Sequence, residues 1–151
     1  MLAPPGIARR WAVVGHTHDR WECTTLFDLP ADDQHRVIVH PAAVDKYTVV
    51  LRRPSVEMLM RTIESGNACA VPATHTVHGG RLLSLRPITL PNEPSWTDRP
   101  ADAPAYLGPM ELYLQLPDAQ IAIIFRRERL LKLATILAEI LLILPENPVA
   151  R

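Results

Sequence analysis

The sequence contains few of the residue patterns by which catalytic sites are usually recognised. It has two cysteines, Cys23 and Cys69, and no CxxC pair, which excludes a disulfide framework. It also lacks a GxGxxG segment and a P-loop, so no nucleotide-binding site is predicted. No serine lies in a GxSxG elbow. These absences favour a protein that is not an enzyme and needs no cofactor.

The chain also has no excess of charge of either sign, because 16 basic residues balance 16 acidic ones. A neutral protein has no overall field to attract a phosphate backbone, so nucleic acid is not expected as a partner. A nucleic-acid-binding accessory protein that uses Arg9, Arg10, Arg52 and Arg53 is kept as an alternative.

Two further absences concern membranes and export. The longest apolar run, residues 130–144, is shorter than the roughly 20 residues that a membrane-spanning helix needs, and it contains Lys132 and Glu139. The first residues, MLAPPGIARRW, have no apolar core of the kind found in signal peptides. We therefore expect a cytoplasmic protein with both thiols free.

The sequence does contain the pattern of a single α+β domain over residues 1–151. Short runs of β-branched and aromatic residues, separated by turn residues, predict six to eight short strands in a mostly antiparallel sheet. Helical spacing appears in residues 54–65 and 126–144, and the second helix is the longer. Residues 1–10 are expected to form a loose arm. The predicted strands are residues 11–15, 20–28, 36–39, 46–52, 68–77, 81–86, 111–116 and 120–125.

Two connections have a distinctive composition. Gly79-Gly80 lies between two strand-like runs and predicts a tight hairpin turn, since paired glycines supply the positive φ that such a turn requires. Residues 87–109 hold six of the 15 prolines and predict a long loop without regular structure. This proline-rich loop carries Trp96 and Tyr106, and aromatic side chains of this type often anchor protein interfaces. Packing of Trp96 back onto the sheet is the alternative.

The strongest pattern is that of the C-terminal helix. Its apolar residues follow the 3-4 spacing of a helix–helix seam, and a second apolar stripe lies beside the first. An apolar arc this wide is more than one face of a small sheet is expected to cover. We therefore predict a homodimer, with burial of the helix inside the monomer as the alternative. The predicted dimer contact includes Leu133, Leu137 and Ile140.

The six histidines occur in loose pairs, and two of these pairs suggest a metal site. His16 and His18 are two residues apart, so on a strand their imidazoles point to the same side. A third ligand from His75 or His78 would complete a catalytic zinc-type set, which is the basis for a small metal-dependent hydrolase as an alternative function. Two imidazoles alone bind a divalent ion weakly, so we do not predict a metal centre.

The string GHTH, residues 15–18, resembles the closing motif of calcineurin-like metallophosphoesterases, whose histidines hold part of a two-metal centre. That family places the motif late in the chain, after its other metal-binding segments, whereas here it lies at residues 15–18. GNAC, residues 66–69, has alanine where the family has a metal-binding histidine. The chain is therefore not assigned to this family.

Together these features predict a non-enzymatic protein-interaction module, such as a small accessory or inhibitor-type factor. We expect it to dimerise through the C-terminal helix and to bind another protein through the proline-rich loop or an exposed strand edge. The metal-dependent hydrolase and the nucleic-acid-binding accessory protein stay as alternatives.

Overall fold

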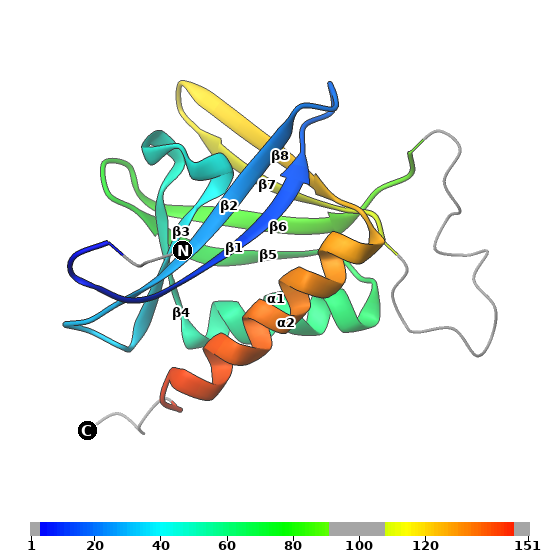
Figure 1. Ribbon diagram of the computed structural model, residues 1–151. Helices are drawn as coiled ribbons and strands as arrows, with labels where there is room; N and C mark the ends of the chain where they lie inside the picture. The colour runs from blue at the N-terminus through cyan, green and yellow to red at the C-terminus, as the bar shows by residue number, and fades with distance from the viewer. Residues whose placement is uncertain (1–3, 91–107, 147–151) are drawn as a thin grey trace.

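The computed structural model describes residues 4–90 and 108–146. Within these residues, eight antiparallel strands form one sheet that closes into a barrel, and two helices pack side by side against it (Figure 1). The strands follow one another around the barrel in chain order. The elements are β1 (Ile7–His16), β2 (Glu22–Pro30), β3 (Arg36–His40), β4 (Val49–Arg52), α1 (Arg53–Ser65), β5 (Cys69–His75), β6 (Gly79–Pro87), β7 (Met110–Leu116), β8 (Ala119–Phe125) and α2 (Arg127–Ile143).

The predicted α+β class is confirmed, including the longer C-terminal helix. Two boundaries are corrected. Residues 7–10 belong to β1 and are not part of a loose arm, because they pair with the end of β2. Residues 45–47 form a short 3₁₀ helix, so the strand predicted over 46–52 begins only at Val49. Neither helix in the described part of the chain is long and apolar enough to cross a membrane.

The turn between β5 and β6 differs from the prediction. It consists of residues 76–78, and the two glycines after it are the first residues of β6, where His75 pairs with Gly79. Gly79 has a φ of 69°, as expected for the left-handed residue that follows a three-residue hairpin loop. Nδ1 of His75 accepts hydrogen bonds of 3.1 Å from the backbone N–H groups of Val77 and His78. An imidazole, and not the glycine pair alone, therefore holds this turn.

The interior of the barrel is filled by side chains. Leu59 from α1 and Leu133 and Leu137 from α2 meet apolar residues of the strands there, including Phe27 and Leu83. The cavity that these residues enclose has a volume of about 10 Å³, which is at most the space of a single water molecule. Where the helices meet the strands, the barrel is therefore a packed core.

Helix α2 completes the wall of the barrel beside β1. Within the described residues, β1 pairs with β8 through the single residue pair His16–Ile124, so most of β1 has no strand partner on that side. Glu139 of α2 lies there instead, and it accepts a hydrogen bond of 2.7 Å from Nε1 of Trp11. At the far end of the helix, Arg53 of α1 donates to the backbone carbonyls of Leu141 and Leu144, which otherwise have no helical donor.

This arrangement changes the interpretation of the C-terminal helix. Leu133, Leu137 and Ile140 are only 3%, 1% and 0% exposed within a single chain, so they cannot form the surface of a dimer. The dimer contact was predicted on the assumption that α2 packs on one face of an open sheet. The sheet is instead a closed barrel, and the barrel and α1 together cover the apolar side of α2. A homodimer stays a prediction, but its contact must use other residues.

Gly15 provides a test of the barrel closure. A Cβ atom at this position would lie 2.6 Å from Cγ2 of Ile123 and 2.8 Å from the carbonyl oxygen of Ile124, so the seam between β1 and β8 has no room for a methyl group. We predict that Gly15→Ala lowers the free energy of unfolding by about 2 kcal/mol through overpacking. Gly80→Ala is the control, because nothing lies within 4 Å of the added atom. Equal denaturant midpoints for the two variants would contradict a tight seam.

Candidate functional site

Two of the four histidines proposed as metal ligands, His16 and His75, already have partners on both ring nitrogens. Nδ1 of His16 lies 2.9 Å from the carbonyl oxygen of Thr17, and its Nε2 accepts from Nε of Arg126 at 3.2 Å. Nε2 of His75 lies 2.7 Å from the carbonyl oxygen of Lys46, while its Nδ1 accepts the turn amides. A carbonyl can only accept, and a guanidinium or a backbone N–H can only donate, so both nitrogens of each ring are already engaged. Neither ring has a nitrogen left for a metal.

The two histidine pairs also lie at opposite ends of β6. His75 pairs with Gly79 at the first residue of β6, and His78 stacks on His75 in the adjoining turn. His18 instead bonds to Glu111, which pairs with Arg86 near the last residue of β6, roughly 20 Å away along the strand. No three His, Cys, Asp or Glu side chains gather around one point in residues 4–90 and 108–146. The hydrolase alternative thus has no ligand set in this part of the chain.

A buried carboxylate, Asp28, joins the first three strands on the outside of the barrel. Arg10 binds both of its oxygens, at 2.6 and 2.7 Å, and Nε2 of His40 lies 2.9 Å from Oδ2. Nδ1 of His40 lies 2.9 Å from Oγ1 of Thr48, so the chain of hydrogen bonds continues to the segment before β4. Burial by itself opposes ionisation, but the bonds from Arg10 and then from His40 outweigh it and lower the pKa of Asp28.

The order of Asp28, His40 and Thr48 is that of a carboxylate–imidazole–hydroxyl triad, but the surroundings argue against catalysis. The bidentate Arg10 neutralises the carboxylate that would have to stabilise an imidazolium ion. The carboxylate of Asp28 is 3% exposed and the ring of His40 only 18% exposed. None of the cavities described for this protein is lined by these residues. The cluster therefore fastens strands together.

A second buried carboxylate, Glu111 on β7, is held in a similar way. Nε2 of His18 lies 2.5 Å from one of its oxygens, and Nε and Nη2 of Arg86 lie 3.0 and 2.9 Å from the other. The carboxylate is 3% exposed, whereas the side chains of His18 and Arg86 are about 60% exposed. In the described part of the chain, the imidazole of His18 has no hydrogen bond to a hydroxyl or thiol that it could activate.

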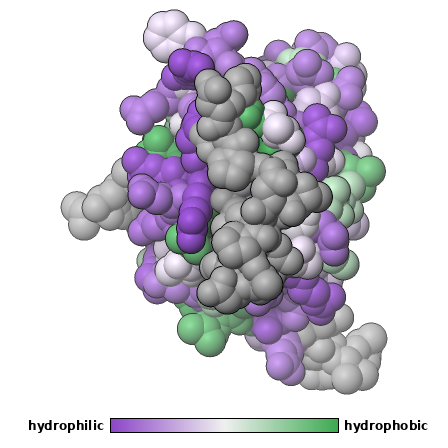
Figure 2. All heavy atoms as spheres, turned by 90° about the vertical axis from the view of Figure 1, so that its right-hand side faces the viewer, coloured by the Kyte–Doolittle hydropathy of each residue, from purple (hydrophilic) through white to green (hydrophobic). Residues whose placement is uncertain are grey.

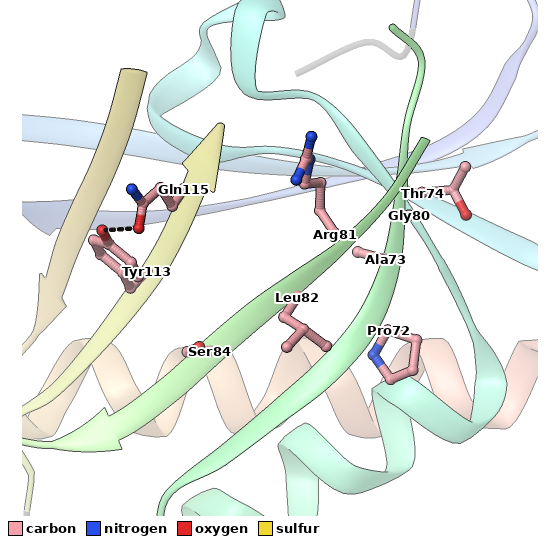
Figure 3. A pocket seen from close by; sticks show the side chains of 9 residues that line it. All are labelled: Pro72, Ala73, Thr74, Gly80, Arg81, Leu82, Ser84, Tyr113 and Gln115. Atoms are coloured by element: carbon pink, nitrogen blue, oxygen red, sulfur yellow. Dashed lines mark hydrogen bonds between the residues drawn. The ribbon is translucent and has the colours of Figure 1, made fainter. Parts of the chain in front are cut away.

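Two hollows on the outer surface have the character of a binding site. The larger has a volume of about 640 Å³ and lies over the outer faces of β5, β6 and β7 (Figure 3). In Figure 3, Leu82 and Arg81 project to opposite sides of β6, as the alternation of a strand requires. Tyr113 and Gln115 lie on the neighbouring strand and are joined by a hydrogen bond of 3.1 Å. The lining residues are Pro72, Ala73, Thr74, Gly80, Arg81, Leu82, Ser84, Tyr113 and Gln115.

The second hollow, of about 410 Å³, is a groove between β4, β5 and α1. It exists because β4 pairs with β5 only at Val49–His75 and Val50–Thr74 and then turns away into α1. Both hollows are lined by Pro72, Ala73 and Thr74, so they form one continuous surface. We call this surface the β5 face and define it by four apolar side chains that line it. These are Val50, Met58, Pro72 and Leu82.

The β5 face exposes large apolar side chains. Leu82 is 60% exposed and Met58 is 41% exposed, and they lie on either side of Pro72. The lining of the two hollows includes the arginines Arg52 and Arg81 but no carboxylate. The coloured residues visible in Figure 2 are mostly hydrophilic by contrast, with hydrophobic atoms in small separate groups. A surface of this kind is typical of a contact with another molecule.

The strand edge in the groove is protected against the addition of a further strand. Pro72 has no N–H group to donate, and its carbonyl oxygen already accepts a hydrogen bond of 2.7 Å from Oγ of Ser55. Prolines occur in sheets mainly at such edges. A partner is therefore expected to contact this face with side chains and not to extend the sheet.

Sequence reasoning did not identify the β5 face. Of the residues predicted to bind partners, Trp96 and Tyr106 lie outside the described residues, and the three α2 residues are in the core. Two signals were available. Leu82 precedes Leu83 and breaks the alternation of apolar and polar residues, and Pro72 within a strand-like run indicates an edge.

Comparison of the chain with protein-family models, with curated proteins and with solved structures gives no match. The function must therefore be argued from the geometry of the surface.

The Asp28 cluster gives a testable pH dependence. Because the pKa of Asp28 is lowered in the folded state, the stabilisation is complete above about pH 4 and is lost as the pH falls through the folded-state pKa. We predict that Asp28→Asn lowers the free energy of unfolding at pH 7 by about 3 kcal/mol, since Arg10 loses its partner. The difference from the wild type should shrink between roughly pH 5 and pH 3.

Asp118→Asn is the matched control, because Asp118 is 66% exposed and 3.6 Å from Lys46. This substitution should lower the free energy of unfolding by less than about 1 kcal/mol at any pH. Urea unfolding of the three proteins over this pH range measures both effects. A difference between wild type and Asp28→Asn that does not change with pH would show that the carboxylate is not the source of the stabilisation.

Proposed function

We propose that the chain is a non-enzymatic protein-binding module, a small accessory or inhibitor-type factor, and that the β5 face is its contact surface. The proposal rests on one observation: the two hollows share Pro72 as a lining residue, and Leu82 and Met58 are exposed on either side of it. Burial of two such side chains in a partner is worth roughly 1.5–3 kcal/mol each. Both cysteines are free thiols, which agrees with the cytoplasmic location we propose.

Three features support a protein rather than a small molecule as the partner. The cavity enclosed by Leu59, Leu133 and the facing strands is only about 10 Å³, which is too small for a ligand. Both hollows lie on the outer surface, and the larger is spread over three strands. Apart from Arg52 and Arg81, the polar groups lining them are neutral, and Ser84 and Thr74 do not converge on one point in Figure 3. Small-molecule sites usually enclose most of their ligand and aim a few polar groups at it.

Nucleic acid is a weaker candidate because the arginines suggested for it are engaged elsewhere. Arg10 is held by Asp28, and Arg53 by the carbonyls at the end of α2. Arg9 lies over the ring of Trp11 and 3.4 Å from Glu139. Of the four, Arg52 alone lines the β5 face. The contribution of Trp96 and Tyr106 to partner binding stays a prediction.

The proposal predicts that charge on the β5 face abolishes binding. Wild type, Leu82→Asp and Met58→Asp would be immobilised and compared by quantitative affinity purification from cells that produce the protein. Val77→Asp is the matched control, because Val77 is 77% exposed but lines neither hollow. We expect a partner retained by wild type and by the control to be lost at least about tenfold with both variants on the β5 face. Retention of the same proteins by all four would refute this surface, provided that thermal unfolding shows all four to be folded.

A further inference from the structure

Helix α2 has an exposed stripe on the side opposite the core. Leu131 and Leu142 are 43% and 87% exposed, and Thr135 and Ala138 lie between them on the same side of the helix. Successive members are four, three and four residues apart. We call these residues the outer stripe. The outer stripe shares no residue with the β5 face.

The outer stripe has a pattern that reads the same in both directions. A large apolar residue stands at each end, and a small residue stands at each of the two middle positions. When two such helices cross antiparallel about a two-fold axis, Leu131 of one copy meets Leu142 of the other, and Thr135 meets Ala138. Self-complementarity of this kind is what a two-fold contact between identical chains requires. Small middle residues allow the two helix backbones to approach closely.

Polar groups near the stripe are compatible with this contact. Oγ1 of Thr135 donates to the carbonyl of Leu131 within its own helix at 3.0 Å, so the hydroxyl needs no partner from a second chain. In the antiparallel arrangement, Arg127 at the start of one α2 lies at the same end of the contact as Glu146, which follows α2 of the other copy. Both residues are exposed and have opposite charges, so the ends of the contact attract each other.

We propose that a second copy of this chain docks on the outer stripe, in an antiparallel arrangement of the two α2 helices. This inference does not depend on the function proposed for the β5 face. The stripe extends over about 16 Å of helix, so the contact belongs to the small class of interfaces and gives a weak, concentration-dependent dimer. The proposal keeps the partner predicted from the sequence and moves the contact to the opposite side of α2.

Sedimentation equilibrium from about 10 μM to 1 mM tests the contact. We expect the average mass of the wild type to rise from 16.9 kDa toward twice that value with concentration. Leu142→Lys should weaken association at least about tenfold, since it places an unpaired charge in the contact. A lysine near a helix C-terminus is favourable for the helix itself, so the fold should be kept. A wild type that stays at 16.9 kDa throughout would overturn the proposal.

Leu82→Lys is the matched control, because it makes the same change at an exposed leucine of the β5 face. Association equal to that of the wild type is expected. If Leu82→Lys abolishes the dimer and Leu142→Lys does not, the β5 face and not α2 holds the second copy, and this proposal is wrong. We expect Leu142→Lys to lose the dimer but to bind the partner normally in affinity purification. This result would show that the outer stripe and the β5 face act independently.

Cysteine cross-linking tests the antiparallel direction. Leu131→Cys and Leu142→Cys would be oxidised separately and as an equimolar mixture, with wild type as the background for Cys23 and Cys69. Peptide mass mapping identifies which thiols are joined. The antiparallel contact predicts disulfides between the two variants in the mixture, in clear excess over disulfides within either variant alone. Efficient disulfides within each variant alone would indicate parallel helices and contradict the arrangement.

Discussion

The structure depends on the insertion of leucine side chains from the two helices into the barrel. Leu59, Leu133 and Leu137 occupy space that the strands alone enclose but do not fill. Removing one such side chain typically costs 2–5 kcal/mol, because the surrounding walls cannot collapse fully. The cavity between these leucines and the strands is only about 10 Å³, so among the described residues the larger hollows are those on the outside.

The route of the chain into α1 creates the surface that is available there. To bring Leu59 inside, β4 must leave the sheet after two residue pairs with β5, and this opens the groove beside Pro72. An open edge would expose unpaired backbone groups. Pro72 removes one donor, and Ser55, in the first turn of α1, binds the carbonyl oxygen. The edge is thus closed to another strand while its apolar side chains stay exposed.

The sequence was sufficient to predict the strands and helices but not how they close. Alternation and helical spacing are local, and both helices and most strands were located to within about two residues. Closure depends on the single pair His16–Ile124 and on the lack of a Cβ at Gly15, and neither has a local signature. The wide apolar arc of α2 therefore implied a dimer contact through Leu137, although a closed barrel buries it. The β5 face was missed for a related reason, since Leu82 becomes notable only once the inward face of β6 is known.

The histidines that suggested a metal site help to hold β1 against β8, where the backbone pairing is weak. One ladder pair joins β1 to β8 in the described residues, so other contacts must hold this side of the barrel. His18 reaches from the turn after β1 to Glu111 on β7, His16 accepts from Arg126 just after β8, and Trp11 donates to Glu139 on α2. The bonds to the carboxylates of Glu111 and Glu139 are partly buried, and a buried hydrogen bond to a charged group contributes roughly 1.5–3 kcal/mol. The bond between Arg126 and His16 is exposed and contributes less. The GHTH string is therefore explained by the topology: both of its imidazoles bind elements that lie across the seam from β1.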